Sequence, residues 1–142
     1  FYNPVMNFLT QIDNLALIAL LLVSGAALFL PTLSTLISGK GLSPTEATIW
    51  MNRRKAAVLD LRPEADFKAG HLPGAKHLLA EQIPSGIDKL KLDRKNPIIL
   101  VCHSGMSARK LVPELKKLGF PEVAVLDGGV QGWQAAALPL VK

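Results

Sequence analysis

Residues 96–119, NPIILVCHSGMSARKLVPELKKLG, join an unbroken apolar run to a loop of small residues and then to a helical pattern. The run at 96–101 predicts a strand buried on both faces, as in a parallel sheet. Residues 107–119 predict a helix that ends at Gly119. Because Pro113 has no amide hydrogen, we expect it either to kink or to restart this helix. The whole unit is typical of a parallel α/β fold.

Strand and helix patterns alternate on both sides of this unit. Helices are expected at 44–53, 63–70 and 128–137, a helical turn at 85–90, and strands at 56–61 and 122–127. Residues 71–78 are expected to turn at Pro73–Gly74 and to give a short strand. Ser43, Pro44 and Glu46 have the spacing of a capping box, which should start the first of these helices. Strands separated by helices favour a parallel sheet covered on both faces.

Charged residues are distributed unevenly over the 142 residues, a length that suits one compact domain. Residues 1–39 contain no Lys or Arg and one acid, Asp13, whereas all 16 bases and 10 of the 11 acids lie from Lys40 onward. Gly39–Gly41 is expected to be a flexible joint. We therefore predict an N-terminal segment at 1–40 and a folded domain at 41–142.

Residues 15–37, LALIALLLVSGAALFLPTLSTLI, contain no charged side chain. As a helix they would be about 35 Å long, enough to cross a hydrocarbon core of roughly 30 Å. A signal peptide would begin with basic residues, and a helix of a soluble core would show a polar stripe; this segment has neither. We therefore expect a single transmembrane helix at about 14–38.

The bases near this segment indicate its orientation. Four of them follow it closely and none precedes it: Lys40, Arg53, Arg54 and Lys55. The positive-inside rule places the domain on the cytoplasmic side of the inner membrane, and a single cysteine suits that compartment. The small residues Ser24–Ala27 would allow contact with a helix of an integral-membrane partner. No interleaving of basic and aromatic residues points to nucleic acid.

Cys102 directly follows the strand predicted at 96–101, at the sheet edge where parallel α/β folds bind ligands. A loop curling round the sulfur would direct backbone N–H groups at it, and the next helix adds positive charge at its N-terminus. Both effects favour a thiolate, the nucleophilic form of cysteine. Gly105 would allow close approach of the backbone. The alternative is that Cys102 is an inert, buried small residue.

The position of the nearest arginine bears on the kind of chemistry. Cys-loop phosphatases carry Arg six residues after the cysteine, where this chain has Ala108, and Arg109 lies one position too far. The loop is also tight for a phosphate. It suits a smaller reacting atom, such as a sulfane sulfur.

Three separated stretches resemble the motifs of one family, the rhodanese-like sulfurtransferases. They are DLRPEADFKAGHLPGA at 60–75, CHSGMSA at 102–108 and LDGGVQGW at 126–133. Order and spacing agree over residues 43–140, and the whole chain looks like the single-domain, membrane-anchored bacterial type. The resemblance implies a rhodanese-like parallel sheet flanked by helices and preceded by one transmembrane helix.

The same resemblance implies a thiosulfate sulfurtransferase. Cys102 would take the outer sulfur of a donor such as thiosulfate, hold it as a persulfide and pass it to a thiophilic acceptor, with no metal or organic cofactor. The implied substrate cradle consists of His103, Ser104, Gly105, Met106 and Ser107. Many members carry Arg five residues after the cysteine, and this chain has Ser107 there. Arg109 is the candidate replacement for that charge.

Other motif residues are expected to support the site rather than to react. Asp60 and Arg62 should tie neighbouring loops together through hydrogen bonds, and His71 should orient the turn at Pro73–Gly74. His77 is expected at the surface, and Trp50 and Trp133 are expected as packing anchors.

A second function class is compatible with the same motifs. The domain could be a membrane-anchored binding module of rhodanese fold that docks a membrane or sulfur-trafficking partner without turnover. The enzyme hypothesis predicts a persulfide on Cys102, and the module hypothesis predicts none. Since the sequence contains no second cysteine, any persulfide must be discharged by another molecule.

Overall fold

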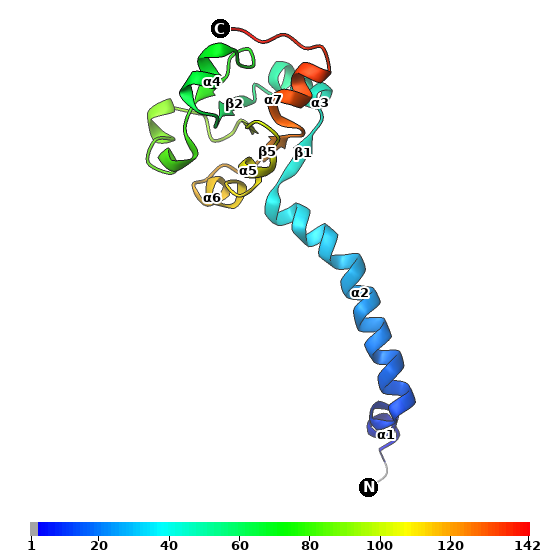
Figure 1. Ribbon diagram of the computed structural model, residues 1–142. Coiled ribbons are helices and arrows are strands. Elements are labelled where there is room, and N and C mark those ends of the chain that lie inside the picture. The colour runs from blue at the N-terminus through cyan, green and yellow to red at the C-terminus, as the bar shows by residue number, and fades with distance from the viewer. Residues whose placement is uncertain (1–2) are drawn as a thin grey trace. The chain divides into compact units, whose positions relative to one another are not determined.

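The computed structural model describes residues 3–142, apart from the side chains of Leu9 and of residues 34–38. The chain divides into two compact units, residues 1–36 and residues 37–142 (Figure 1).

The first unit consists of two helices, α1 (Pro4–Thr10) and α2 (Ile12–Ser38). The helix predicted at 14–38 is confirmed, and it continues through Pro31. Residues Ile12–Leu33 are long and apolar enough to cross a membrane, by length and composition. Large apolar side chains along this stretch are exposed, Leu21 by 73% and Leu28 by 77%. Such a surface suits lipid better than water.

The second unit is built on five parallel strands in the order β1-β5-β4-β2-β3. The strands are β1 (Lys40–Leu42), β2 (Ala57–Asp60), β3 (Lys76–His77), β4 (Ile98–Val101) and β5 (Val123–Leu126). Each residue of the central strands β4 and β5 is buried, as the unbroken apolar runs predicted. The predicted parallel α/β fold is therefore confirmed.

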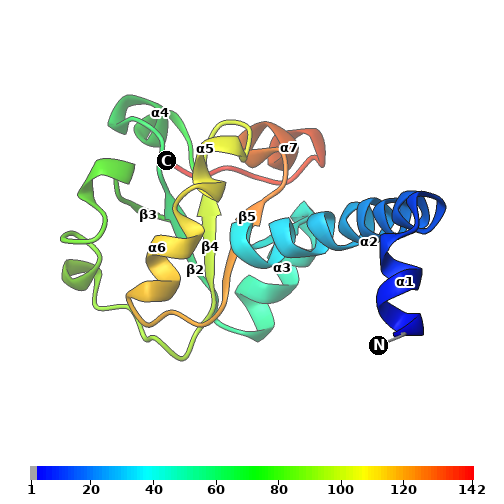
Figure 2. The ribbon, with the colours of Figure 1, turned by 90° about the horizontal axis from the view of Figure 1, so that it is seen from below.

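Helices cover both faces of this sheet. They are α3 (Pro44–Arg53), α4 (Glu64–Ala69), α5 (Met106–Arg109), α6 (Val112–Lys117) and α7 (Gly129–Ala135), with 3₁₀ turns η1 (Ala80–Gln82) and η2 (Asp88–Leu90). Alternate residues of β4 point to opposite faces. Ile98 and Leu100 pack with α6, whereas Ile99 and Val101 pack with α3 and α7. Figure 2 shows β4 running toward α5, so the segment that links them lies at the carboxyl edge of the sheet.

The capping box at the start of α3 is present as predicted. The Ser43 hydroxyl accepts a hydrogen bond from the Glu46 N–H at 3.2 Å, and the Glu46 carboxylate accepts one from the Ser43 N–H at 3.0 Å. The hydrogen bond from the Ser43 backbone lowers the pKa of Glu46. Local sequence therefore fixes where the first helix of the domain begins.

Two predicted elements differ in the structure. The joint expected at Gly39–Gly41 is wrong, because Lys40–Leu42 forms β1 and pairs with β5. Leu42 is completely buried, and this packing holds a strand that its glycine would not favour alone. The helix expected at 107–119 is split into α5 and α6, and Pro113 lies in the first turn of α6, where no amide hydrogen is needed.

Candidate active site

Cys102 lies at the carboxyl end of β4, at the start of the Cys102 loop (residues 102–107). Its Sγ accepts a hydrogen bond from the Gly105 N–H at 2.9 Å. The residue is only 5% exposed and borders the apolar cluster beneath α5 and α6. The lone thiol therefore faces backbone dipoles on one side and apolar side chains on the other.

The loop favours the ionised form of this thiol. Burial raises the pKa of Cys102, whereas hydrogen bonds from the Ser107 hydroxyl and from the backbone N–H groups of Ala108, Gly105 and Ser104 lower it. The hydrogen bonds prevail, and the pKa lies below the ordinary value of a cysteine thiol. A lowered pKa increases the fraction of a cysteine that is present as thiolate at a given pH.

Gly105 permits the geometry that turns the N–H groups toward the sulfur. Its φ is +91°, in the left-handed region that side chains disfavour, and it is the residue from which α5 begins. A Cβ here would also lie 3.0 Å from the carbonyl oxygen of Leu126. The glycine therefore serves both the turn and the packing of the loop on β5.

The glycines after β5 pack against the same loop. The N–H of Val130 donates to the carbonyl of Cys102 at 3.0 Å. A Cβ on Gly129 would overlap the carbonyl oxygen of Cys102, so only glycine fits at that point. The motif at 126–133 thus supports the Cys102 loop. The sequence of this motif resembles that of rhodanese-like proteins, but nothing in it predicted that Gly129 and Val130 would contact the carbonyl of Cys102.

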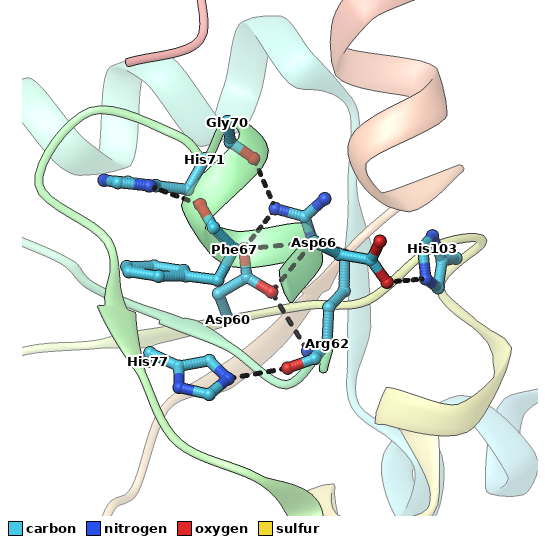
Figure 3. A network of polar contacts seen from close by, with 8 residues as sticks. All are labelled: Asp60, Arg62, Asp66, Phe67, Gly70, His71, His77 and His103. Carbon is cyan, nitrogen blue, oxygen red and sulfur yellow. Dashed lines mark hydrogen bonds and ion pairs between the residues drawn. The ribbon is translucent and has the colours of Figure 1, made fainter. Parts of the chain in front are cut away.

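His103 leans toward α4 rather than standing free. Its Nε2 lies 3.1 Å from Oδ2 of Asp66, and both side chains are largely exposed (Figure 3). The contact joins the Cys102 loop to α4. Sequence reasoning did not single out Asp66, since its partner is 37 residues away.

Arg109, the candidate replacement for the missing arginine of the loop, is already paired. Its Nη2 donates to Oδ1 of Asp127 at 2.9 Å, at the exposed rim of the domain. Four predicted cradle residues are exposed on the loop: His103, Ser104, Met106 and Ser107. The loop therefore offers hydrogen-bond donors to a ligand, and the charge of the Arg109 guanidinium is already balanced by the Asp127 carboxylate.

Asp60 and Arg62 form a buried ion pair at the end of β2. Nη2 of Arg62 lies 2.7 Å from Oδ2 of Asp60 and donates to the carbonyl of Gly70 at 2.6 Å (Figure 3). The two residues are 0% and 6% exposed. The pair ties the end of β2 to the loop that follows α4.

The two histidines of this region pack on either side of Phe67. The His71 ring stacks on Phe67 at 3.9 Å, and its Nδ1 lies 2.9 Å from the Phe67 carbonyl oxygen. His71 therefore holds the end of α4. The turn at Pro73–Gly74, which His71 was expected to orient, begins two residues later in the sequence. His77 was expected at the surface, but it is half-buried in β3, with Nε2 2.7 Å from the carbonyl oxygen of Arg62.

The two tryptophans have different environments. Trp133 is 3% exposed in the cluster between the sheet and α7, where its Nε1 donates to the Pro139 carbonyl at 2.9 Å. Trp50 packs at the edge of the same cluster, with the Arg54 guanidinium over its ring. Among the side chains that the structure describes, no group of three or more His, Cys, Asp or Glu residues is arranged to hold a metal ion.

Comparisons with known proteins agree on the kind of domain. The sequence model of the rhodanese-like domain family matches residues 43–136 of the chain. The chain is 37% identical over 144 residues to the uncharacterized protein YibN of Escherichia coli K12, covering 99% of this chain and 98% of that protein. It is 31% identical over 97 residues to the thiosulfate sulfurtransferase GlpE of Pseudoalteromonas translucida, covering 68% of this chain and 90% of that protein.

Solved structures give the same fold. A thiosulfate sulfurtransferase from Pseudomonas aeruginosa matches 72% of this chain with a TM-score of 0.67 and 31% identity, but the match spans only 19% of that longer chain. A rhodanese-related protein from Thermoplasma volcanium matches 72% of this chain and 98% of its own, with a TM-score of 0.61. Its 20% identity bears on the fold alone.

Proposed function

The chain belongs to the rhodanese-like family, and from this premise we propose that it is a sulfurtransferase that carries sulfane sulfur on Cys102. The observation that carries the proposal is the Gly105 N–H at 2.9 Å from Sγ, within a loop that lowers the pKa of the thiol. Relatives about 30% identical that are named thiosulfate sulfurtransferases support thiosulfate as a donor.

In the first half-reaction the Cys102 thiolate attacks the outer sulfur of thiosulfate. A bond forms between Sγ and that sulfur while the bond to the sulfonate sulfur breaks, and sulfite leaves with the electron pair. Cys102 becomes a persulfide, one sulfur atom heavier. The N–H groups that stabilise the thiolate also face the negative charge of the terminal sulfur. In this proposal the substrate contacts come from His103 to Ser107.

In the second half-reaction a thiophilic acceptor, such as cyanide or a thiolate, attacks the terminal sulfur. The bond between the two sulfurs of the persulfide breaks, and its electron pair returns to Sγ as a thiolate. The acceptor leaves as thiocyanate or as a new persulfide. Because the sequence holds no second cysteine, the acceptor comes from another molecule.

We further propose that α2 anchors the protein in the inner membrane with the domain on the cytoplasmic side. The apolar stretch Ile12–Leu33 and the bases that follow it support this arrangement. The patch Ser24–Ala27 is where a helix of an integral-membrane partner would pack. An impermeant maleimide tests the orientation in a Cys102→Ser, Lys142→Cys chain. We expect labelling in inverted vesicles, and labelling in intact cells would contradict the proposal.

A docking module without turnover is the second candidate. One observation favours it: the imidazole of His103 and the guanidinium of Arg109 both already contact carboxylates, so neither is free for an anionic donor. The module would show no turnover with any sulfane donor, and Cys102→Ser would retain its partner.

Turnover measurements separate the two candidates. The full chain in detergent is incubated with thiosulfate and cyanide, and thiocyanate is measured. We expect thiocyanate from the wild type and none above background from Cys102→Ser. Equal rates of thiocyanate formation in both chains would exclude the proposed enzyme. It would also be excluded if neither thiosulfate nor an organic persulfide gave thiocyanate with the wild type.

A further inference from the structure

A small pocket lies beside the Cys102 loop, between α4, α7 and the C-terminal segment. Its volume is about 160 Å³, and it is lined by Arg62, Asp66, Ala69, Gly70, Val130, Gln134 and Leu140. Two lining residues contact the loop directly: Val130 donates to the carbonyl of Cys102 at 3.0 Å, and Asp66 contacts His103 at 3.1 Å. We call it the Arg62 pocket.

Arg62 brings unused hydrogen-bond donors to this pocket. The residue is 6% exposed, and its Nε and Nη2 are held by Asp60 and by the carbonyl of Gly70. Among the residues that the structure describes, Nη1 has no hydrogen-bond partner, and in Figure 3 it carries no dashed line. No described side-chain nitrogen or oxygen is both fully buried and unpartnered, so Nη1 is not completely buried, and Arg62 is one of the residues that line the pocket. Its two N–H groups suit a carboxylate.

Asp66 supplies the opposite charge on the wall of the same pocket. Its Oδ2 lies against His103, and within the described chain Oδ1 has no hydrogen-bond donor. A carboxylate oxygen of this kind suits an ammonium group. The pocket therefore presents a donor pair and an acceptor that no described residue occupies.

The balance of charges narrows the ligand class. Asp60 and Arg62 neutralise each other as a buried pair, so Asp66 leaves the pocket with an excess negative charge when its partner His103 is neutral. A simple anion would gain from Arg62 and lose from Asp66, whereas a zwitterion would be matched at both ends.

The volume of the pocket and its apolar lining narrow the class of ligand further. Pockets for drug-sized ligands usually measure roughly 300–1,000 Å³, well above this one. Ala69, Val130 and Leu140 give the pocket apolar walls that would suit a short aliphatic stem. A single amino acid fits these limits.

We propose that the Arg62 pocket binds the amino-acid end of a small amino-acid thiol of the cysteine class, which is the sulfur acceptor. Its carboxylate lies on Nη1 of Arg62 and its ammonium group on Oδ1 of Asp66. This inference rests on the proposed function of Cys102. The bound thiolate attacks the terminal persulfide sulfur, the persulfide S–S bond breaks, and the electron pair returns to Sγ. The products are an amino-acid persulfide and the free Cys102 thiolate.

Binding is tested without any transfer chemistry in the Cys102→Ser chain. S-methyl-L-cysteine, S-methylcysteamine and 3-(methylthio)propionate serve as probes, because the last two lack the carboxylate or the ammonium group. Calorimetry should show that the zwitterion binds at least about tenfold more tightly, since each lost charge leaves its partner in the pocket unpaired. Equal affinities, or no affinity for the zwitterion, would overturn the pocket proposal.

Two substitutions on α4 localise the effect. Ala69→Phe grows a side chain into the pocket, and Ala65→Phe places the same ring at an exposed position of the same helix outside the lining. We expect S-methyl-L-cysteine binding to be lost in the first chain and kept in the second. Both positions are exposed, so neither change removes a buried contact. Loss in both chains, or in neither, would remove the pocket from the binding site.

Transfer to free thiols tests the acceptor role. The persulfide form of the wild-type chain is mixed with cysteine, cysteamine or 3-mercaptopropionate, and its decay is followed by mass spectrometry. Cysteine should react at least about tenfold faster, and Ala69→Phe should abolish that preference. Equal rates for the three thiols would overturn the acceptor role. If no donor ever loads Cys102, the proposed function fails, while the binding series in Cys102→Ser still decides the pocket.

Discussion

Gly129 packs directly against the carbonyl oxygen of Cys102, at a distance that leaves no room for a Cβ atom. Its φ of +56° is also unfavourable for any residue with a side chain. The next N–H donates to the same carbonyl at 3.0 Å. The start of α7 is therefore fitted to the Cys102 loop, although Gly129 and Cys102 are 27 positions apart in the sequence.

Gly129→Ala should destabilise the domain and disorder the loop. The change combines a strained φ with overlap against backbone, and together these should cost about 2–5 kcal/mol of unfolding free energy. Gly74→Ala is the matched control, because Gly74 has a φ of +75° but nothing near its missing Cβ. It should cost only about 1–2 kcal/mol. Urea unfolding in detergent measures both, and equal losses would show that the contact with Cys102 is unimportant.

The thiol of Cys102 should ionise more readily than an ordinary cysteine thiol, because hydrogen bonds from its loop lower its pKa. We expect the rate of alkylation by iodoacetamide to rise with pH through a midpoint below that of the same cysteine in the unfolded chain. The shift also affects stability. Because the folded pKa is lowered, its contribution is complete above the unfolded pKa and is lost as pH falls through the folded value. Unfolding free energy should therefore rise with pH between these two values in the wild type and not in Cys102→Ser.

Ser107→Ala should raise the pKa of Cys102, because it removes the hydroxyl that donates to the thiolate. Hydrogen bonds to charged groups are worth about 1.5–3 kcal/mol, so alkylation near pH 7 should slow by roughly an order of magnitude. Ser104→Ala is the control for the titration, since Ser104 acts on the sulfur through its backbone N–H. If the pKa of Cys102 shifted equally in both variants, the Ser107 hydroxyl would have no special effect on the thiolate.

Asp60→Asn should be among the most damaging single changes in the domain. It leaves the Arg62 guanidinium buried without its counter-ion, which typically costs about 3–5 kcal/mol. Glu64→Gln breaks the exposed pair with Lys68 and should leave the unfolding free energy almost unchanged. A small effect of Asp60→Asn would mean that the buried pair contributes little to holding the end of β2.

Elements with strong local signals were predictable from the sequence. The apolar run of β4 predicted a fully buried strand, and the Ser43 capping box predicted the start of α3. β1 was not predictable, because three residues that include a glycine have weak strand preference, and pairing with β5 holds them in place. Pro113 predicted that the helix at 107–119 would either kink or restart. In the structure it restarts, as α6.

The sequence predicted the chemical groups around Cys102 better than it predicted the contacts that hold them. The position of Cys102 after a strand and before small residues indicated N–H groups around the sulfur. The contacts of Asp66 with His103 and of Asp127 with Arg109 join residues 37 and 18 positions apart. No periodicity or spacing encodes such pairs, since the fold alone brings their elements together. His77 was wrongly placed at the surface for the same reason.

The most direct test of the account is the mass of the intact chain after incubation with a sulfane donor. Purified protein is treated with thiosulfate or with an organic persulfide, freed of excess donor and analysed by mass spectrometry before and after reduction. We expect a gain of one sulfur atom on Cys102 that a reducing agent removes and that Cys102→Ser never shows. An unchanged mass with every donor would contradict the claim that this loop holds a reactive, sulfur-carrying thiolate.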